Sequence, residues 1–146
     1  MTGQAVAAYL AGTMPRILLI DDDEFVSVTL QQYLAARECE VVVATDREAA
    51  ELRLVDGTYD LVLVDPYMTG EAHREVGAMI TSIRVLQPEA AIVIVSAYTS
   101  PQLIAAADAN GSSAVLTKPQ SVLFVSQLIM TSLRVRRGGS QESLSA

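Results

Sequence analysis

The sequence predicts a doubly wound α/β domain, in which helices cover both faces of a five-stranded parallel sheet. Five apolar segments of strand length alternate with five segments of helical pattern. Such alternation is typical of right-handed βαβ crossovers. The strand segments are nearly continuous runs of Val, Ile and Leu, as expected when both faces of a sheet are buried. The most distinctive run is Asp60–Asp65, which begins and ends on a carboxylate.

The five predicted strands share an apolar interior and polar or turn-forming neighbours. The strand order 2-1-3-4-5, called flavodoxin-like, is common for doubly wound sheets of this size. In this order the first and third strands are neighbours, and the topology reverses between them. In chain order the predicted strands are Ile17–Ile20, Val41–Ala44, Asp60–Asp65, Ala91–Val95 and Ala114–Thr117.

Start and stop signals define the five helices. Asp23 caps the first, Thr45-Asp46-Arg47-Glu48 forms a capping box for the second, and Ser100-Pro101 begins the fourth. Glycines after the second, fourth and last helices mark their ends, including the pair Gly138-Gly139. The predicted helices are 24–37, 46–56, 71–86, 101–110 and 121–137. Core positions are predicted at Val26, Leu30, Tyr33 and Leu34 in the first helix and at Val122, Val125, Ile129 and Leu133 in the last.

Length and composition restrict the functions that are open to the chain. Its 146 residues suit one domain, which we place at 15–137 between a leader (1–14) and a flexible tail (138–146). The leader is either disordered or a docked helix. The net charge of −7 argues against a nucleic-acid surface, and no apolar run reaches the roughly 18 residues that span a membrane. The uncharged leader lacks the basic region of a signal peptide, and the single Cys39 suits a reducing compartment. We therefore predict a cytoplasmic protein.

Polar groups follow four of the predicted strands at one edge of the sheet. Asp21-Asp22-Asp23 follows the first strand, Asp65 the third, Ser96 the fourth and Lys118 the fifth. Taken singly, each has an ordinary interpretation: a helix cap, a loop carboxylate, a strand-end hydroxyl and an exposed lysine. Together they gather where α/β sheets place their chemistry. Clustered carboxylates are unfavourable without a cation, and Mg²⁺ prefers carboxylate and phosphate oxygens. The cluster predicts a metal ion, a phosphoryl group, or both.

The same residues resemble the receiver domain of two-component response regulators. The matching motifs are Asp21-Asp22, Asp65, Ser96-Ala97 and Lys118-Pro119, and the resemblance covers about Arg16 to Arg137. It implies a signalling switch rather than an enzyme, with only self-phosphorylation and slow self-dephosphorylation. A histidine kinase or phosphotransfer protein would donate a phosphoryl group to Asp65. By the resemblance, Mg²⁺ would be bound by Asp21, Asp22, Asp65 and the Tyr67 backbone carbonyl, with Ser96 as the switch hydroxyl and Lys118 as a phosphate contact.

The resemblance also implies a protein partner on the face made by the fourth helix, the fifth strand and the last helix. The fourth helix carries a single charge, at Asp108, and several apolar residues of the last helix fall outside its core stripe. Two interpretations stay open: a wide buried stripe, or a surface for a downstream target or a homodimer. No direct contact with nucleic acid or membrane is expected. The residues outside the stripe are Leu123, Phe124, Met130 and Val135.

The chain departs from the family pattern in three places. Met68 is followed by Thr69-Gly70 instead of a proline and an acidic residue, and Val115 stands where an aromatic residue is usual. Nothing after Arg137 could form a DNA-binding domain, so we expect a stand-alone receiver or one cut from a longer protein. The first two departures favour a pseudo-receiver, an interaction module without a phosphorylation cycle. The presence of the full set Asp21, Asp22, Asp65, Ser96 and Lys118 argues against it and favours a receiver that can be phosphorylated.

A haloacid-dehalogenase-like phosphatase is a further alternative, because Asp21-x-Asp23 resembles the start of that family's motif. Against it, the chain is short for that family, has no plausible later acidic pair, and places Asp65 where that family does not need it.

Overall fold

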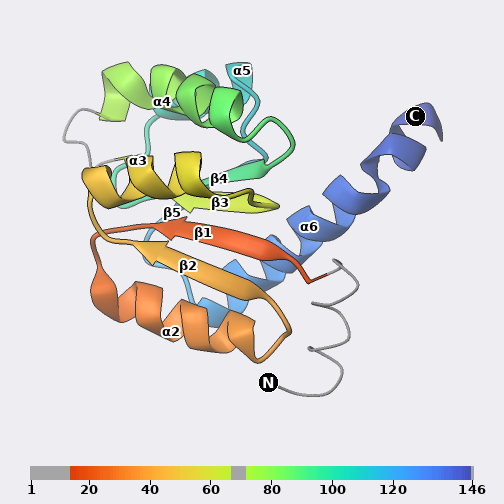
Figure 1. Cartoon of the computed structure of the whole chain (residues 1–146). Helices are drawn as coiled ribbons and strands as arrows, with labels where there is room; N and C mark the ends of the chain where they lie inside the picture. Colours follow the sequence, from red (N-terminus) through yellow and green to blue (C-terminus); the bar gives the residue numbers. More distant parts are fainter. Residues whose placement is uncertain (1–13, 67–71, 146) are drawn as a thin grey trace.

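The computed structural model of the protein has a five-stranded parallel sheet with the order β2-β1-β3-β4-β5 (Figure 1). It describes residues 14–66 and 72–145, with the backbone alone for 72–75 and 136–145. The predicted fold class and strand order are therefore confirmed. The strands are β1 (Arg16–Ile20), β2 (Glu40–Ala44), β3 (Leu61–Val64), β4 (Ala91–Ser96) and β5 (Ala114–Thr117).

Helices cover both faces of this sheet, as Figure 1 shows. One face carries α2 (Glu24–Ala35) and α6 (Val122–Ser145). The other carries α3 (Arg47–Asp56), α4 (Ala72–Leu86) and α5 (Pro101–Ala109). Among the residues described, no helix is both long and apolar enough to cross a membrane.

The core consists of two layers that share the strands. Successive strand side chains point to opposite faces, so alternate residues of one strand enter different layers. In β1, Ile17 and Leu19 pack with α2 and α6, whereas Leu18 and Ile20 pack with the other three helices. This alternation within uninterrupted apolar runs explains why the strands could be recognised from their composition.

The strand registers bring the carboxyl ends of β1 and β3 together. Ile20 is paired with Val64, and the next backbone amide, that of Asp65, donates to the Ile20 carbonyl at 2.9 Å. Further along the strand order, between β4 and β5, Ser96 is paired with Thr117. The polar residues that follow these strands therefore share one edge, as predicted.

Three local predictions are wrong. The second helix is capped by Asp46, whose side chain accepts from the Ala49 N–H at 2.7 Å, and not by Thr45. Val26 is 37% exposed and Ser27 is buried in its place, because Leu30 and Leu34 set the inward face of α2. The last helix continues past Gly138-Gly139 to Ser145. Glycine weakens a helix by about 1 kcal/mol relative to alanine without forbidding it. The flexibility of 138–146 stays a prediction.

A buried glutamine ties several segments together at the opposite end of the sheet from the acidic cluster. The Gln87 side chain, 3% exposed, accepts from the Tyr59 N–H at 2.9 Å. Its amide nitrogen donates to the carbonyls of Leu54 (2.8 Å) and Gly57 (2.6 Å). The residue after α4 therefore anchors that helix to the end of α3 and to the segment that leads into β3.

Candidate functional site

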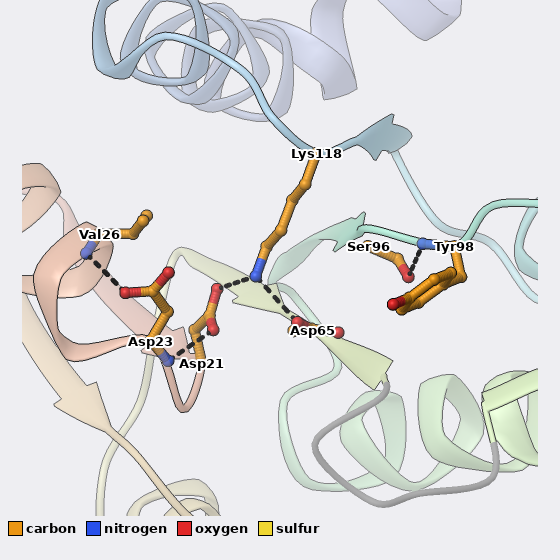
Figure 2. Close-up of polar contacts among 7 residues, drawn as sticks. All are labelled: Asp21, Asp23, Val26, Asp65, Ser96, Tyr98 and Lys118. Atoms are coloured by element: carbon orange, nitrogen blue, oxygen red, sulfur yellow. Dashed lines mark hydrogen bonds and ion pairs between the residues drawn. The ribbon is translucent and has the colours of Figure 1, made fainter.

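Two carboxylates and one lysine meet at the carboxyl end of the sheet (Figure 2). The Lys118 ammonium lies 2.7 Å from Asp21 Oδ2 and 2.9 Å from Asp65 Oδ2. Asp21 follows β1 and Asp65 follows β3, so the pairing of these strands places the carboxylates side by side. Both are almost fully buried, with 3% and 7% exposure. The structure thus joins three of the predicted site residues in one ion-pair network.

The three acidic residues after β1 have different roles in the local structure. Asp21 Oδ1 accepts from the Asp23 N–H at 3.0 Å, which holds the turn after the strand. The Asp23 side chain caps α2 by accepting from the Val26 N–H at 3.2 Å, as predicted. Asp22 is exposed. Helix capping therefore uses one carboxylate of the triplet and leaves the other two for the site.

Burial and the ion pairs act in opposite directions on this network. Burial raises the pKa of Asp21 above its usual value, although Lys118 and the Asp23 N–H favour the ionised carboxylate. Burial alone would lower the pKa of Lys118, but its hydrogen bonds to Asp21 and Asp65 outweigh this effect and raise it above 10.5. The lysine is therefore charged at neutral pH. Two carboxylates facing one ammonium leave a site that attracts a further cation.

Oxygens of Asp21, Asp22 and Asp65 lie close enough to share a metal ion. One oxygen from each lies within 4.8 Å of the others. A set of carboxylate oxygens suits a hard divalent cation such as Mg²⁺ or Ca²⁺. Tyr67, whose backbone carbonyl was predicted as another ligand, lies outside the described residues, as does the unusual Met68–Gly70 segment.

Ser96 ends β4 next to this network. It has no exposed surface, and its Oγ accepts from the Tyr98 N–H at 3.1 Å (Figure 2). Its carbonyl accepts from the Lys118 N–H at 2.8 Å, so the ends of β4 and β5 are joined beside the lysine. A hydroxyl that accepts one hydrogen bond keeps its own hydrogen for another acceptor. The hydroxyl hydrogen of Ser96 is therefore available to another acceptor, although in this structure Oγ is directed toward the Tyr98 N–H.

The sequence reasoning missed a second hydroxyl contact in this region. Thr99 Oγ1 and Thr117 Oγ1 lie 2.7 Å apart and join the loop after β4 to the last residue of β5. The available signal was the predicted end of the fifth strand at Thr117, together with a hydroxyl just beyond the fourth. Val115 is partly buried against the core layer of α3, α4 and α5.

Hollows flank the network on both sides of the sheet. One, of about 310 Å³, lies between α2 and α6 and is lined by Lys118, Asp23 and apolar side chains such as Val26 and Val122. The other, of about 220 Å³, lies between α3 and α4 and reaches Asp65. The buried site is therefore bordered by open space on either side.

Comparison with known proteins identifies the family. The model of the response regulator receiver domain matches residues 17–128. The chain belongs to this family. The curated relatives include the sensory/regulatory protein RpfC of Xanthomonas campestris, 30% identical over 108 residues, which are 71% of this chain and 14% of RpfC. The chain spans a quarter or less of the length of the first curated relatives it matches.

Solved receiver structures share the fold. A CheY-like receiver domain protein from Methanospirillum hungatei has a TM-score of 0.77 at 21% identity and covers 86% of this chain and 98% of its own. A response regulator from Burkholderia pseudomallei has a TM-score of 0.70 at 24% identity, covering 88% and 72%. The latter structure contains a phosphorylated aspartic acid, a calcium ion and citrate.

Membership of the receiver family confirms the predicted resemblance and the assignment to two-component signalling. Receiver domains are signalling domains rather than classical enzymes. The family match gives no support to the alternative of a haloacid-dehalogenase-like phosphatase.

Proposed function

We propose that this receiver domain is a phosphorylation-dependent switch and that Asp65 accepts the phosphoryl group. The observation that carries the proposal is the buried Asp65 carboxylate, which contacts Lys118 at 2.9 Å beside Asp21 at the topological switch point. Such a carboxylate can serve as a nucleophile. A histidine kinase or phosphotransfer protein would donate the group, and the hollows beside the site offer room for its approach.

The transfer needs only groups that are already at the site, together with a divalent cation. An Asp65 oxygen forms a bond to phosphorus while the phosphorus–nitrogen bond of the donor's phosphohistidine breaks, and the electron pair stays on the imidazole nitrogen. In this proposal phosphoryl oxygens would be contacted by Lys118, which already lies 2.9 Å from Asp65, and by the hydroxyl of Ser96 at the end of β4. Mg²⁺ held by Asp21, Asp22, Asp65 and the Tyr67 carbonyl would neutralise charge on the phosphoryl oxygens.

Intact mass tests the proposal directly. The protein is incubated with Mg²⁺ and acetyl phosphate, whose phosphorus–oxygen bond breaks to release acetate. We expect wild type and Asp60→Asn to gain one phosphoryl group and Asp65→Asn to gain none. Asp60 is a matched control because it precedes the same strand, at its opposite end, and accepts from the Arg16 N–H. A folded wild type that gains no mass would favour the pseudo-receiver. Slow loss of the adduct would report self-dephosphorylation.

We further propose that α5, β5 and α6 form the output face, where a downstream protein or a second copy of the chain binds. Phe124 on α6 and Ile104 on α5 are exposed apolar side chains, which support this role. Leu123 is also exposed, but it borders a hollow that it shares with Tyr33 and Arg37 beside α2. Met130 is partly buried and its sulfur contacts the buried Cys39 thiol, so it contributes less to the surface.

Sedimentation of wild type and of Leu123→Ser/Phe124→Ser, with and without acetyl phosphate, tests self-association. A phosphorylation-dependent dimer that the double substitution abolishes supports it. A monomer under all conditions leaves a downstream protein as the partner. We place this exchange in the cytoplasm, in keeping with the single free thiol.

A further inference from the structure

The loop that joins β4 to α5 is short and is held at both ends. It leaves the sheet after Ser96, the last residue of β4. It enters α5 at Ser100, whose hydroxyl caps the helix by accepting from the Leu103 N–H at 3.1 Å. Three residues, Ala97 to Thr99, therefore connect the candidate site to the first turn of a helix on the output face.

Two hydrogen bonds hold the three-residue segment in place. The Tyr98 N–H donates to Ser96 Oγ at 3.1 Å, and the Thr99 hydroxyl lies 2.7 Å from the Thr117 hydroxyl. Thr117 is the register partner of Ser96 and directly precedes Lys118. Both contacts therefore tie the segment to the site.

The orientation of the Ser96 hydroxyl is coupled to the position of this segment. Figure 2 shows Ser96 Oγ directed toward the Tyr98 backbone nitrogen, whereas the contact between Lys118 and Asp65 lies on its other side. Turning Oγ toward a phosphoryl group on Asp65 would take the acceptor away from the Tyr98 N–H. A polar group that loses its partner in a partly buried position is destabilised unless the segment shifts with it. A shift of Tyr98 moves its neighbour Thr99 and strains the contact with Thr117.

We propose that the Thr99–Thr117 hydroxyl pair is a latch that keeps Ser96 in its unphosphorylated orientation and resists phosphorylation of Asp65. Thr99 and Thr117 are then positioning residues, since they act through Ser96 and do not touch the phosphoryl group. The inference rests on the proposed function. Through this hydroxyl pair the loop after Ser96 is linked to β5 without an aromatic residue at position 115, where Val115 packs against the core.

Binding of beryllofluoride, a phosphoryl mimic, tests the latch. Its affinity in the presence of Mg²⁺ is measured by calorimetry for the full chain and for Thr99→Val, Thr117→Val and the double variant. Valine keeps the branched shape and removes the hydroxyl. If the pair is lost on binding, each single variant should bind about two- to three-fold more tightly, the low end of the range for one hydrogen bond, because the pair is exposed to solvent. The double variant should match the singles, and Thr99→Ser, which keeps the hydroxyl, should match wild type.

The outcomes separate the latch from the proposed function. Unchanged or weaker binding in the valine variants, or gains that add in the double variant, would overturn the latch while leaving phosphorylation of Asp65 intact. A folded wild type that binds no more beryllofluoride than Asp65→Asn would overturn the proposed function and the latch with it. The Tyr98 amide signal in NMR provides an independent readout. On binding it should lose the hydrogen-bonded shift that it has in the free protein, and an unmoved signal would contradict the latch.

Discussion

Replacing Lys118 with methionine should destabilise the protein near neutral pH by about 3 kcal/mol. The side chain reaches both buried carboxylates, and methionine keeps its approximate length without its charge. Asp21 and Asp65 would then face each other with oxygens no more than 4.8 Å apart. At an effective dielectric constant of about 20, two unit charges at this separation repel by about 3.5 kcal/mol. Loss of one member of a buried ion pair typically costs about 3–5 kcal/mol.

The pH dependence identifies the cause of this loss. Burial already raises the pKa of Asp21 in wild type, and in the variant Lys118 no longer opposes this effect. A raised carboxyl pKa costs nothing below the unfolded value of about 3.9, and its cost grows as pH rises from there to the folded value, above which it stays constant. The difference from wild type should therefore shrink on acidification. It should also shrink on adding Mg²⁺, which supplies the missing positive charge.

Thermal and urea denaturation measure the effect. A loss of about 3 kcal/mol corresponds to a fall in Tm of about 6–12 °C for a chain of this size. Lys118→Arg, which keeps the charge, is the control and should lose much less. Equal stability of Lys118→Met and wild type near neutral pH would refute the reasoning, and so would a deficit unaffected by acid and by Mg²⁺.

Three further predictions concern stability. The higher stability of wild type relative to Lys118→Met should persist up to pH 10.5 and disappear at higher pH, because Lys118 loses its proton as pH rises through its raised pKa. Urea titrations of both proteins across this range test this, and a stability difference that survives deprotonation would contradict it. Gln87→Leu should lower the free energy of unfolding measured in urea by about 2–4 kcal/mol, because it leaves the Tyr59 N–H and two carbonyls without their partner. Hydrogen exchange at the Tyr59 amide should become faster, and unchanged exchange would argue against the role of Gln87 as its hydrogen-bond partner. Gly111→Ala should cost about 1 kcal/mol although nothing lies within 4 Å of the added carbon, since Gly111 has φ +88°. The exposed Ser113→Ala is the control, and an equally stable Gly111 variant would show that the positive φ is not required.

The fold could be predicted because each strand is an unbroken apolar run with a polar boundary. Asp60 and Asp65 mark the two ends of β3 to within one residue, and Ser100-Pro101 marks the start of α5. Parallel connectivity then brought Asp21, Asp65, Ser96 and Lys118 to one edge with no knowledge of the tertiary packing. These features depend on local chemistry and on topology, and both can be inferred from sequence.

The remaining details depend on competition between similar groups. Thr45 and Asp46 are both good caps, and only the entry path of the chain selects Asp46. Val26 does not lie in the core as predicted, because the orientation of α2 that buries Leu30 and Leu34 turns Val26 toward solvent. The contact between Thr99 and Thr117 joins residues 18 positions apart through hydroxyls that have many possible partners. No periodicity in the sequence encodes such a choice.

The three hydrogen bonds of Gln87 have a mechanical consequence for α4. The glutamine amide carries no charge, so these bonds persist at any pH and at any state of ionisation of the acidic cluster. They fasten the far end of α4, whereas its first turn follows the segment that leaves Asp65. A helix that is held at its C-terminal end moves more readily at its N-terminal end. The Gln87 bonds therefore favour a tilt of α4 over a translation, and a tilt would move the neighbouring α5 most at the end nearest the site.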